Sequence, residues 1–207
     1  MNNSNSHIIQ VYNSRKNLLE ILETRGFNTS SYNNFSISEI GILTEQDQLD
    51  MLLEDSNNKK IYVKYYINKV IKPPNVYSII EDLFYLENIL TKKDDLMIIV
   101  KDEPNDTLVQ TIKDIWMQDN IYTSTINIKR LQFNILNHVL VPKHSILSKP
   151  EEIEFKKKFN ILDNNIPDIS YFSPVSLVLG IRPTDIVKIE RKSRTAIKAD
   201  FYRICKL

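Results

Sequence analysis

The sequence is poor in three features on which particular chemistries depend. Cys205 is its only cysteine, so the chain forms no intramolecular disulfide and no metal site built on several thiolates, and a reducing compartment is expected. Only 3 of its 207 residues are glycine, which argues against glycine-rich loops that cradle phosphate groups. No apolar run approaches the roughly 20 residues that span a bilayer, and residues 1–6 are polar without a following signal-type core. We therefore expect a soluble, intracellular protein without a membrane partner.

The charged residues are divided unevenly along the chain. Residues 1–134 carry 14 basic and 18 acidic side chains, whereas residues 135–207 carry 13 and 8, so the overall charge of +1 conceals a basic C-terminal part. This asymmetry and the length favour two modest domains, 1–134 and 135–207. A basic module suits either an acidic protein partner or nucleic acid. The abundance of Asn, Ile and Lys is typical of A+T-rich coding sequence and hints at a large DNA virus or an A+T-rich eukaryote.

Apolar periodicity in the first 134 residues predicts alternating helices and strands. Apolar residues from Ile8 to Leu22 recur at three- and four-residue steps, which indicates an amphipathic helix that ends before Gly26. The remaining elements expected here are a strand over Lys60–Tyr66, a helix over Val76–Leu90 that follows Pro73-Pro74, a strand over Asp95–Val100, a helix over Leu108–Ile115 and a strand over Ile121–Ile126. This order predicts a mostly parallel sheet with right-handed crossovers, the α/β class.

Acidic residues flank the middle strand of this expected sheet. We interpret Asp94-Asp95 and Asp102-Glu103 as solvated acids in turns, and Asp106 as the N-cap of the helix that follows.

The last 73 residues contain clear signals for short helices. Ser148-Lys149-Pro150-Glu151 has the spacing of a capping box, with proline near the start of the helix, where no N–H donor is needed. Ser173 followed by Pro174 predicts a second helical turn, and Gly180 suits the left-handed position that closes it.

Period-two alternation begins at Asp185. It predicts a strand in which Val187, Ile189, Arg191 and Ser193 face one side, and a partner strand from Lys198 to Ile204. The pattern of the C-terminal part therefore indicates a β-ribbon against small helices, an α+β arrangement.

Several motifs in this region, in fixed order, resemble the C-terminal module of the fifth subunit shared by the eukaryotic nuclear RNA polymerases, a module that also exists as a small subunit of the archaeal enzyme. The matching segments are His138-Val139-Leu140-Val141-Pro142-Lys143-His144, Ile166-Pro167-Asp168-Ile169, Ser173-Pro174-Val175, Leu179-Gly180, Ile186–Ala196 and Tyr202-Arg203. Two positions depart from the family pattern: Ser173 replaces an aspartate, and Ile197 replaces a glycine in the turn before the last strand.

The resemblance implies a fold and a function. It implies the long eukaryotic or viral form, with an N-terminal jaw domain of nuclease-like topology beside downstream DNA and a C-terminal assembly domain. It further implies a non-catalytic polymerase subunit that docks on the largest subunit, in the nucleus or, for a virus, in the virion and host cytoplasm. No cofactor, metal or homo-oligomer is expected. The residues that match the family motif and are expected to dock are His138, Pro142, Lys143, His144, Pro174, Arg182, Lys188, Arg191, Ser193, Thr195, Tyr202 and Arg203.

Two alternative functions remain open from the sequence. A nuclease of this topology needs an acid two residues before a lysine to hold Mg²⁺, but Tyr62 stands in that position before Lys64. A stand-alone nucleic-acid-binding module is compatible with the basic C-terminal part. In the jaw, the acidic segment 102–106 repels phosphate, so only weak contact with downstream duplex DNA is expected. His138 and His144 are separated by roughly 20 Å on an extended strand, which argues against a shared metal ion.

Overall fold

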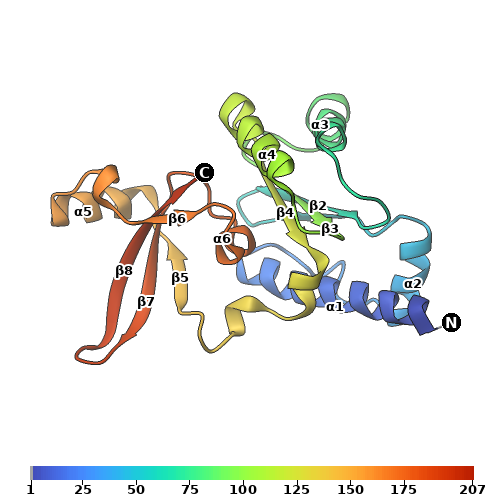
Figure 1. Ribbon diagram of the computed structural model, residues 1–207, viewed down its shortest axis with the longest axis horizontal. Helices are drawn as coiled ribbons and strands as arrows, with labels where there is room; N and C mark the ends of the chain where they lie inside the picture. Colours follow the sequence, from blue (N-terminus) through green and yellow to red (C-terminus); the bar gives the residue numbers. More distant parts are fainter. Residues whose placement is uncertain (1) are drawn as a thin grey trace. The chain divides into compact units, whose positions relative to one another are not determined.

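The computed structural model describes residues 2–207, with side chains described from residue 6 onward. The chain forms two compact units, Met1–Asn134 and Ile135–Leu207. Each unit combines a four-stranded sheet with helices (Figure 1), so the expected mixed α/β class is confirmed. No helix among the described residues combines the length and apolar character needed to cross a bilayer.

The first unit follows the order of elements that the periodicity predicts, with additions. Its elements are α1 (Asn2–Thr24), α2 (Ile37–Glu45), β1 (Met51–Glu54), β2 (Lys60–Tyr66), α3 (Pro73–Ile80), the π-helical turn η1 (Glu81–Leu86), β3 (Asp95–Val100), α4 (Asp106–Asp119), β4 (Tyr122–Asn127) and the 3₁₀ turn η2 (Ile128–Gln132).

The sheet of the first unit has the order β1-β2-β3-β4. The pairs β2–β3 and β3–β4 are parallel, as expected, whereas β1, which the sequence analysis did not anticipate, adds an antiparallel edge. Both parallel connections step in the same direction, so right-handed crossovers place α3 and α4 on one face, and Figure 1 shows α1 on the other. Covered on both sides, β3 and β4 are buried along their whole length.

Two helix boundaries in this unit differ from the prediction. The helix that begins at Pro73 ends at Leu86 rather than Leu90, because Asn88 adopts a left-handed conformation (φ 52°) and the Leu83 carbonyl accepts the N–H groups of both Ile89 and Leu90. The N-cap of α4 is Asn105, whose Oδ1 accepts the Leu108 N–H at 3.0 Å, so Asp106 is the first helical residue instead.

Asp94 and Asp95 are not the solvated acids that we expected. Their exposed fractions are 3% and 0%. The Asp95 carboxylate binds Arg25 Nη2 at 2.6 Å and Lys59 Nζ at 2.9 Å, and Asp94 accepts the backbone N–H of Lys60 and of Thr91. Asp95 therefore ties the end of α1 and the start of β2 to the start of β3 through buried charge. In contrast, Asp102 and Glu103 are exposed, as expected.

The second unit is built on a smaller sheet. Its elements are η3 (Ile135–Asn137), β5 (Lys143–Ile146), α5 (Lys149–Phe159), η4 (Asp163–Asn165), β6 (Asp168–Ser170), α6 (Pro174–Leu179), β7 (Ile186–Ser193) and β8 (Ile197–Lys206). The strand order is β5-β7-β8-β6, with the β7–β8 hairpin at its centre. The hairpin confirms the predicted ribbon, while the short edge strands β5 and β6 were not predicted.

The short helices of this unit begin and end as their capping residues predict. Ser173 Oγ accepts the Ser176 N–H at 3.2 Å, and Gly180 closes α6 with φ 71°. At the start of α5, the Glu151 carboxylate accepts the backbone N–H of Ser148 at 2.7 Å and also its hydroxyl.

The core of the second unit lies between α5 and one face of the sheet. Phe155 from α5 packs with Ile166, Ile186 and Ile204. Tyr202 extends this cluster, with its ring centroid 4.2 Å from that of Phe155. This sheet face is therefore occupied by the unit's own helix.

The turn between β7 and β8 contains an unusual backbone conformation. Ile197 stands where the family pattern has glycine, and it adopts φ 56° with 85% of its surface exposed. A β-branched residue in the left-handed region clashes with its own backbone, a cost of roughly 1–2 kcal/mol. The turn geometry survives the substitution, at the expense of local strain.

Replacement of Asp95 by asparagine should strongly destabilise the first unit. The variant keeps the shape of the side chain but leaves Arg25 as a buried cation that has lost its carboxylate, which costs about 3 kcal/mol or more in the free energy of unfolding. Urea denaturation at neutral pH measures the change. Glu103→Gln, which breaks an exposed pair with Arg130, is the matched control and should cost less than about 1 kcal/mol. Equal losses in the two variants would contradict this role of Asp95.

Replacement of Ile197 by glycine should raise the stability of the protein by about 1 kcal/mol, because relief of left-handed strain exceeds the entropic cost of glycine. Ile153→Gly, the same change at an exposed position within α5, should instead lower stability by about 1 kcal/mol. Thermal unfolding of both variants compares the signs, and a destabilising Ile197→Gly would refute the strain.

Candidate functional site

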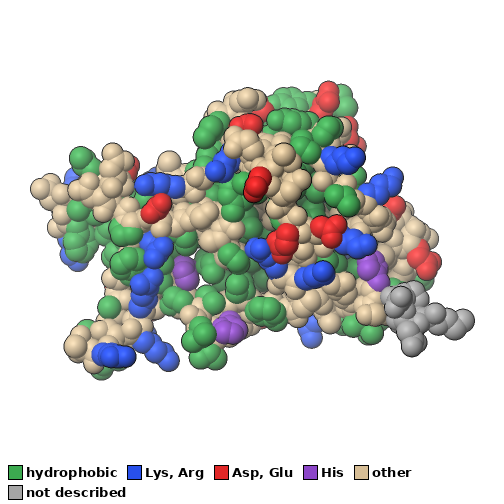
Figure 2. Space-filling model, in the orientation of Figure 1, with side chains coloured by type: hydrophobic (Ala, Val, Ile, Leu, Met, Phe, Trp, Pro, Cys, Tyr) green, Lys and Arg blue, Asp and Glu red, His purple; other side chains and the backbone are tan. Residues whose placement is uncertain are grey.

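The second sheet presents one face that α5 does not cover. Because paired residues on neighbouring strands project to the same side, the register assigns each side chain to a face. His144, Ile189 and Phe201 form one row across β5, β7 and β8, with Arg203 and Arg191 in the rows on either side. We call the surface formed by His144, Arg191, Phe201 and Arg203 the basic face. Figure 2 shows Lys and Arg side chains spaced along the hairpin.

The Phe201 ring is the centre of the basic face. The guanidinium carbon of Arg191 lies 4.3 Å from its centroid, and that of Arg203 lies 5.4 Å away. Contacts of this kind stabilise a cation over an aromatic face and restrict its orientation. The ring therefore holds two guanidinium groups in place without neutralising them, which leaves both charges available to a carboxylate.

His144 is held in a defined state next to these cations. Its Nδ1 lies 2.7 Å from the Pro142 carbonyl oxygen, and since a carbonyl only accepts, Nδ1 carries the proton. Burial lowers the pKa of His144, and the positive charges of Arg191 and Arg203 lower it further, against the Pro142 hydrogen bond, which raises it. A lowered pKa favours the neutral ring at physiological pH, with Nε2 as an acceptor.

Arg203 also fastens the edge of the sheet. Its Nη1 donates to the Asp168 carbonyl at 2.9 Å, across to β6. Its Nε is buried and has no hydrogen-bond partner among the described residues. The guanidinium thus combines a structural contact with unused donor capacity.

Three of the residues expected to dock lie on the opposite face: Lys143, which pairs with Glu190 in the register, Lys188 and Tyr202. Lys188 pairs with Tyr202 in the register and forms an ion pair with Asp200 at 2.9 Å. The Tyr202 ring packs against Phe155 and Phe159 of α5. Lys188 thus joins the two strands of the hairpin and Tyr202 joins the hairpin to α5, so the structure does not place them with Arg191 and Arg203.

Four further expected residues lie at the ends of elements or in the turns that connect them. Ser193 Oγ accepts the backbone N–H of Thr195 and of Ala196, both at 3.3 Å, so Ser193 and Thr195 organise the hairpin turn. Pro174 is the first residue of α6. The Arg182 backbone N–H donates to the Asp185 carboxylate at 2.9 Å, in the turn before β7.

The segment that leads into β5 carries His138 and Pro142, with Lys143 as the first residue of the strand, and it has an apolar surface that was not predicted. His138 accepts the Leu140 N–H through Nδ1 at 3.2 Å, and Lys143 is exposed on β5. Val139 and Leu140, in the turn between them, are 89% and 83% exposed.

These apolar residues and Phe201 were not predicted as site residues. The position of Val139-Leu140 inside the family motif was the signal for that pair. For Phe201, the signal was the period-two spacing from Arg203, which places both residues on the same face.

The position that a nuclease would use for its acid is engaged in a different contact. The Tyr62 hydroxyl donates to Asp50 at 3.2 Å, and Lys64 forms an ion pair with the same carboxylate. Burial raises the pKa of the Tyr62 phenol well above its ordinary value, and the nearby Asp50 carboxylate raises it further. Among the described residues, no group of three or more His, Cys, Asp or Glu side chains lies together in a way that could hold a metal ion.

Comparisons with known proteins place the second unit in a family. The family model for the C-terminal domain of RNA polymerase Rpb5 matches residues 133–205, the region that contains the basic face. The DNA-directed RNA polymerase subunit Rpo5 of Thermococcus kodakarensis is 44% identical over 73 residues, which cover 35% of this chain and 89% of that protein. The Rpo5 subunit of Archaeoglobus fulgidus is 43% identical over 74 residues, 36% of this chain and 97% of its own length.

A longer eukaryotic relative extends the similarity to the first unit. The DNA-directed RNA polymerases I, II, and III subunit rpabc1 of Dictyostelium discoideum is 25% identical over 192 residues, 92% of this chain and 94% of that protein. The archaeal matches cover nearly all of their own proteins at more than 40% identity, and the eukaryotic match spans both units. The chain therefore belongs to the Rpb5/Rpo5 family of DNA-directed RNA polymerase subunits.

Proposed function

We propose that this protein is a non-catalytic subunit of a multisubunit DNA-directed RNA polymerase. It docks on the largest subunit through the basic face of residues 135–207, while the large subunits carry out nucleotidyl transfer. The observation that carries the proposal is that the family match at residues 133–205 includes every residue of the basic face. On this proposal the protein acts in the nucleus or, if its source is a virus, in the virion and host cytoplasm.

The geometry of the basic face supports docking to a protein. Arginine and aromatic residues are enriched at the centres of protein interfaces, because they offer large contact area together with directed hydrogen bonds. Arg191 and Arg203 are oriented in advance by Phe201, which lowers the entropy lost on binding. A partner that presents a carboxylate to this pair would form charge-assisted hydrogen bonds with both arginines.

The exposed apolar pair favours a protein partner over nucleic acid. Val139 and Leu140 leave almost their whole side chains in water, and burying them against a partner would contribute about 1.5–3 kcal/mol each. Phosphate backbones offer no comparable apolar surface. We propose that the turn around Val139 and Leu140 is a second anchor of the same docking interface.

For the first unit we propose the role of the jaw near downstream DNA, with 1–134 and 135–207 as the two domains. The loop after β3 gives little support to firm DNA contact. Glu103 and Arg130 form a two-fold hydrogen-bonded pair at 3.0 and 2.8 Å, so the arginine beside this acidic loop is already engaged. Any contact with duplex DNA at this loop would be weak and sensitive to salt.

The two rival functions make different demands on the chain. A nuclease would need Asp50 free to bind Mg²⁺, whereas Tyr62 and Lys64 both bind it. A stand-alone nucleic-acid-binding module would need the isolated protein to bind DNA with an affinity that falls steeply as salt rises.

Charge reversal at Arg191 should weaken docking without unfolding the protein. We expect Arg191→Glu to reduce recovery of the two largest polymerase subunits by about tenfold or more in a mild-salt pull-down of tagged protein from its native source, read by mass spectrometry. Arg203→Glu should act in the same direction. Lys192→Glu is the matched control: it makes the same charge change one residue away, on the opposite face of β7, and should leave recovery unchanged.

Equal recovery of polymerase subunits with Arg191→Glu and with the unaltered protein would reject the basic face as the docking surface. Thermal unfolding must show that Arg191→Glu is folded. Failure of the unaltered protein to recover any polymerase subunit, together with salt-sensitive DNA binding by the isolated chain, would support the nucleic-acid module instead. Mg²⁺-dependent cleavage of DNA would support the nuclease.

A further inference from the structure

The first unit contains a buried arginine that lacks a carboxylate partner. Arg15, on α1, is 4% exposed. Its Nη1 donates to the Leu49 carbonyl at 2.8 Å, and its Nε is buried without a hydrogen-bond partner. Among the described residues no Asp or Glu forms an ion pair with it. A buried, uncompensated cation is costly, so its presence suggests a function.

The surroundings of Arg15 keep it charged and in place. Its guanidinium carbon lies 5.5 Å from the centroid of the Tyr32 ring and 5.3 Å from that of Phe35. Burial lowers the pKa of Arg15, while the nearby Tyr65 and Tyr32 phenols raise it. The Tyr32 hydroxyl is itself tied to the backbone of Leu52 in β1 at 3.3 Å, so this ring is a fixed wall.

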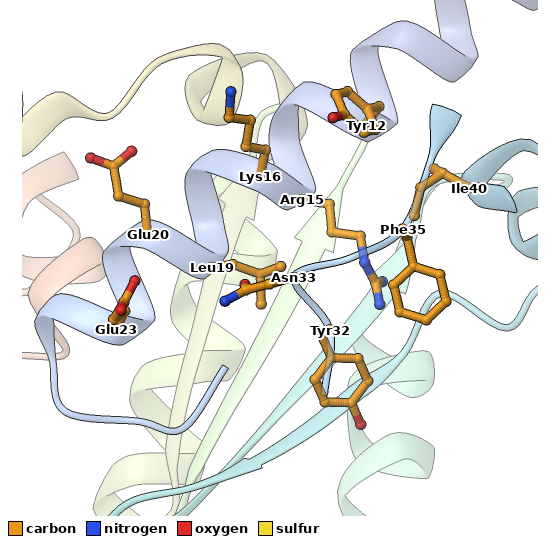
Figure 3. A pocket seen from close by; sticks show the side chains of 10 residues that line it. All are labelled: Tyr12, Arg15, Lys16, Leu19, Glu20, Glu23, Tyr32, Asn33, Phe35 and Ile40. Carbon is orange, nitrogen blue, oxygen red and sulfur yellow. The ribbon is translucent and has the colours of Figure 1, made fainter. Parts of the chain in front are cut away.

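Arg15 lines one end of a groove of about 380 Å³ between α1 and the segment that leads to α2. Figure 3 shows Arg15 projecting from α1 toward Tyr32 and Phe35, with Glu20 and Glu23 further along the same helix. Glu23 is eight residues from Arg15, about 12 Å along the helix axis, and it is exposed. The groove lining thus carries two cations, Arg15 and Lys16, and two acids, Glu20 and Glu23, further along the helix.

The charges of the groove select the chemistry of its ligand. Nη1 of Arg15 already donates to Leu49, whereas the buried Nε has no partner, so the guanidinium retains donor capacity for the oxygens of a single carboxylate. A phosphate dianion or a nucleic acid would carry two or more negative charges into a groove in which Glu20 and Glu23 already offset Arg15 and Lys16. The acidic end instead favours a positive group about three or four extended residues away from the carboxylate.

We propose that this groove binds a peptide segment of a partner protein, with an acidic side chain or a free C-terminal carboxylate on Arg15 and a basic side chain near Glu23. The rings of Tyr32 and Phe35 hold the guanidinium and exclude water from the contact. This site is separate from the basic face, and it requires nothing of the polymerase docking proposed above.

The test measures binding of short peptides to the full chain by fluorescence anisotropy. The probes are fluorescein-labelled, C-amidated alanine peptides that carry one glutamate and one arginine at spacings of two to five residues. We expect the tightest binding at a spacing of three or four. Replacing the glutamate of the probe by glutamine should weaken binding about tenfold, and Arg15→Gln in the protein should do the same, with little further loss when both changes are combined.

Matched variants separate the two ends of the groove from general effects on the fold. Glu23→Gln, at an exposed position, should weaken binding of the probe that contains arginine. It should not change binding of a probe in which that arginine is replaced by glutamine. Arg130→Gln removes an exposed arginine of the same unit and should change nothing. Arg15→Lys keeps the charge but loses the planar guanidinium, so it should also weaken binding. This variant replaces Arg15→Gln in the test if Arg15→Gln does not fold.

A second measurement does not depend on the peptide sequence. The Arg15 Nε–H signal in a ¹H–¹⁵N spectrum should shift when acetate is added and shift less with inorganic phosphate at equal ionic strength. An unmoved signal in acetate, or a larger response to phosphate, would overturn the proposal. Peptide binding that is equal in Arg15→Lys and the unaltered protein would overturn it as well.

Discussion

The pairing of β7 with β8 is the constraint on which the second unit depends. The register matches Ile186 with Ile204 and Val187 with Arg203, and from this start the alternation assigns every later residue to a face. One face carries Ile186, Ile204 and Tyr202 against α5, and the other carries the basic face. A slip of one residue would place arginines against α5 and turn Ile186 and Ile204 away from it. The same hydrogen bonds therefore specify both the core and the surface offered to a partner.

Buried charge has two different roles in the first unit. Arg25 is balanced by Asp95, and this pair fastens α1 to the central strand of the sheet. Arg15, ten residues earlier on the same helix, is similarly removed from water but is flanked by aromatic rings instead of a carboxylate. Aromatic faces stabilise a cation only partly, by about 2 kcal/mol when desolvated, whereas a buried carboxylate neutralises it. The contrast between the two arginines marks the second as a cation that the chain itself leaves without a counter-charge.

Much of the fold could be predicted because the signals are local. The periodicity of β2, β3 and α4, the cap at Ser173 and the left-handed Gly180 depend on residues within a few positions of each other. The errors arise where distant residues decide. Asp95 looks like a turn acid until Arg25, seventy residues earlier, is brought against it. The edge strands β5 and β6 are four and three residues long, too short for alternation to distinguish them from loops.

The candidate site shows a different limit. A motif match groups Lys188, Arg191, Tyr202 and Arg203 as one set, because all four lie in the same two segments of sequence. Alternation along the paired strands divides them: Lys188 and Tyr202 serve the contact with Asp200 and α5, while Arg191 and Arg203 surround Phe201 on the face that α5 does not cover. A motif records which residues recur together but not which face each one occupies. Because α5 covers only one face of the sheet, the register separates the residues that pack with α5 from those that we propose for docking.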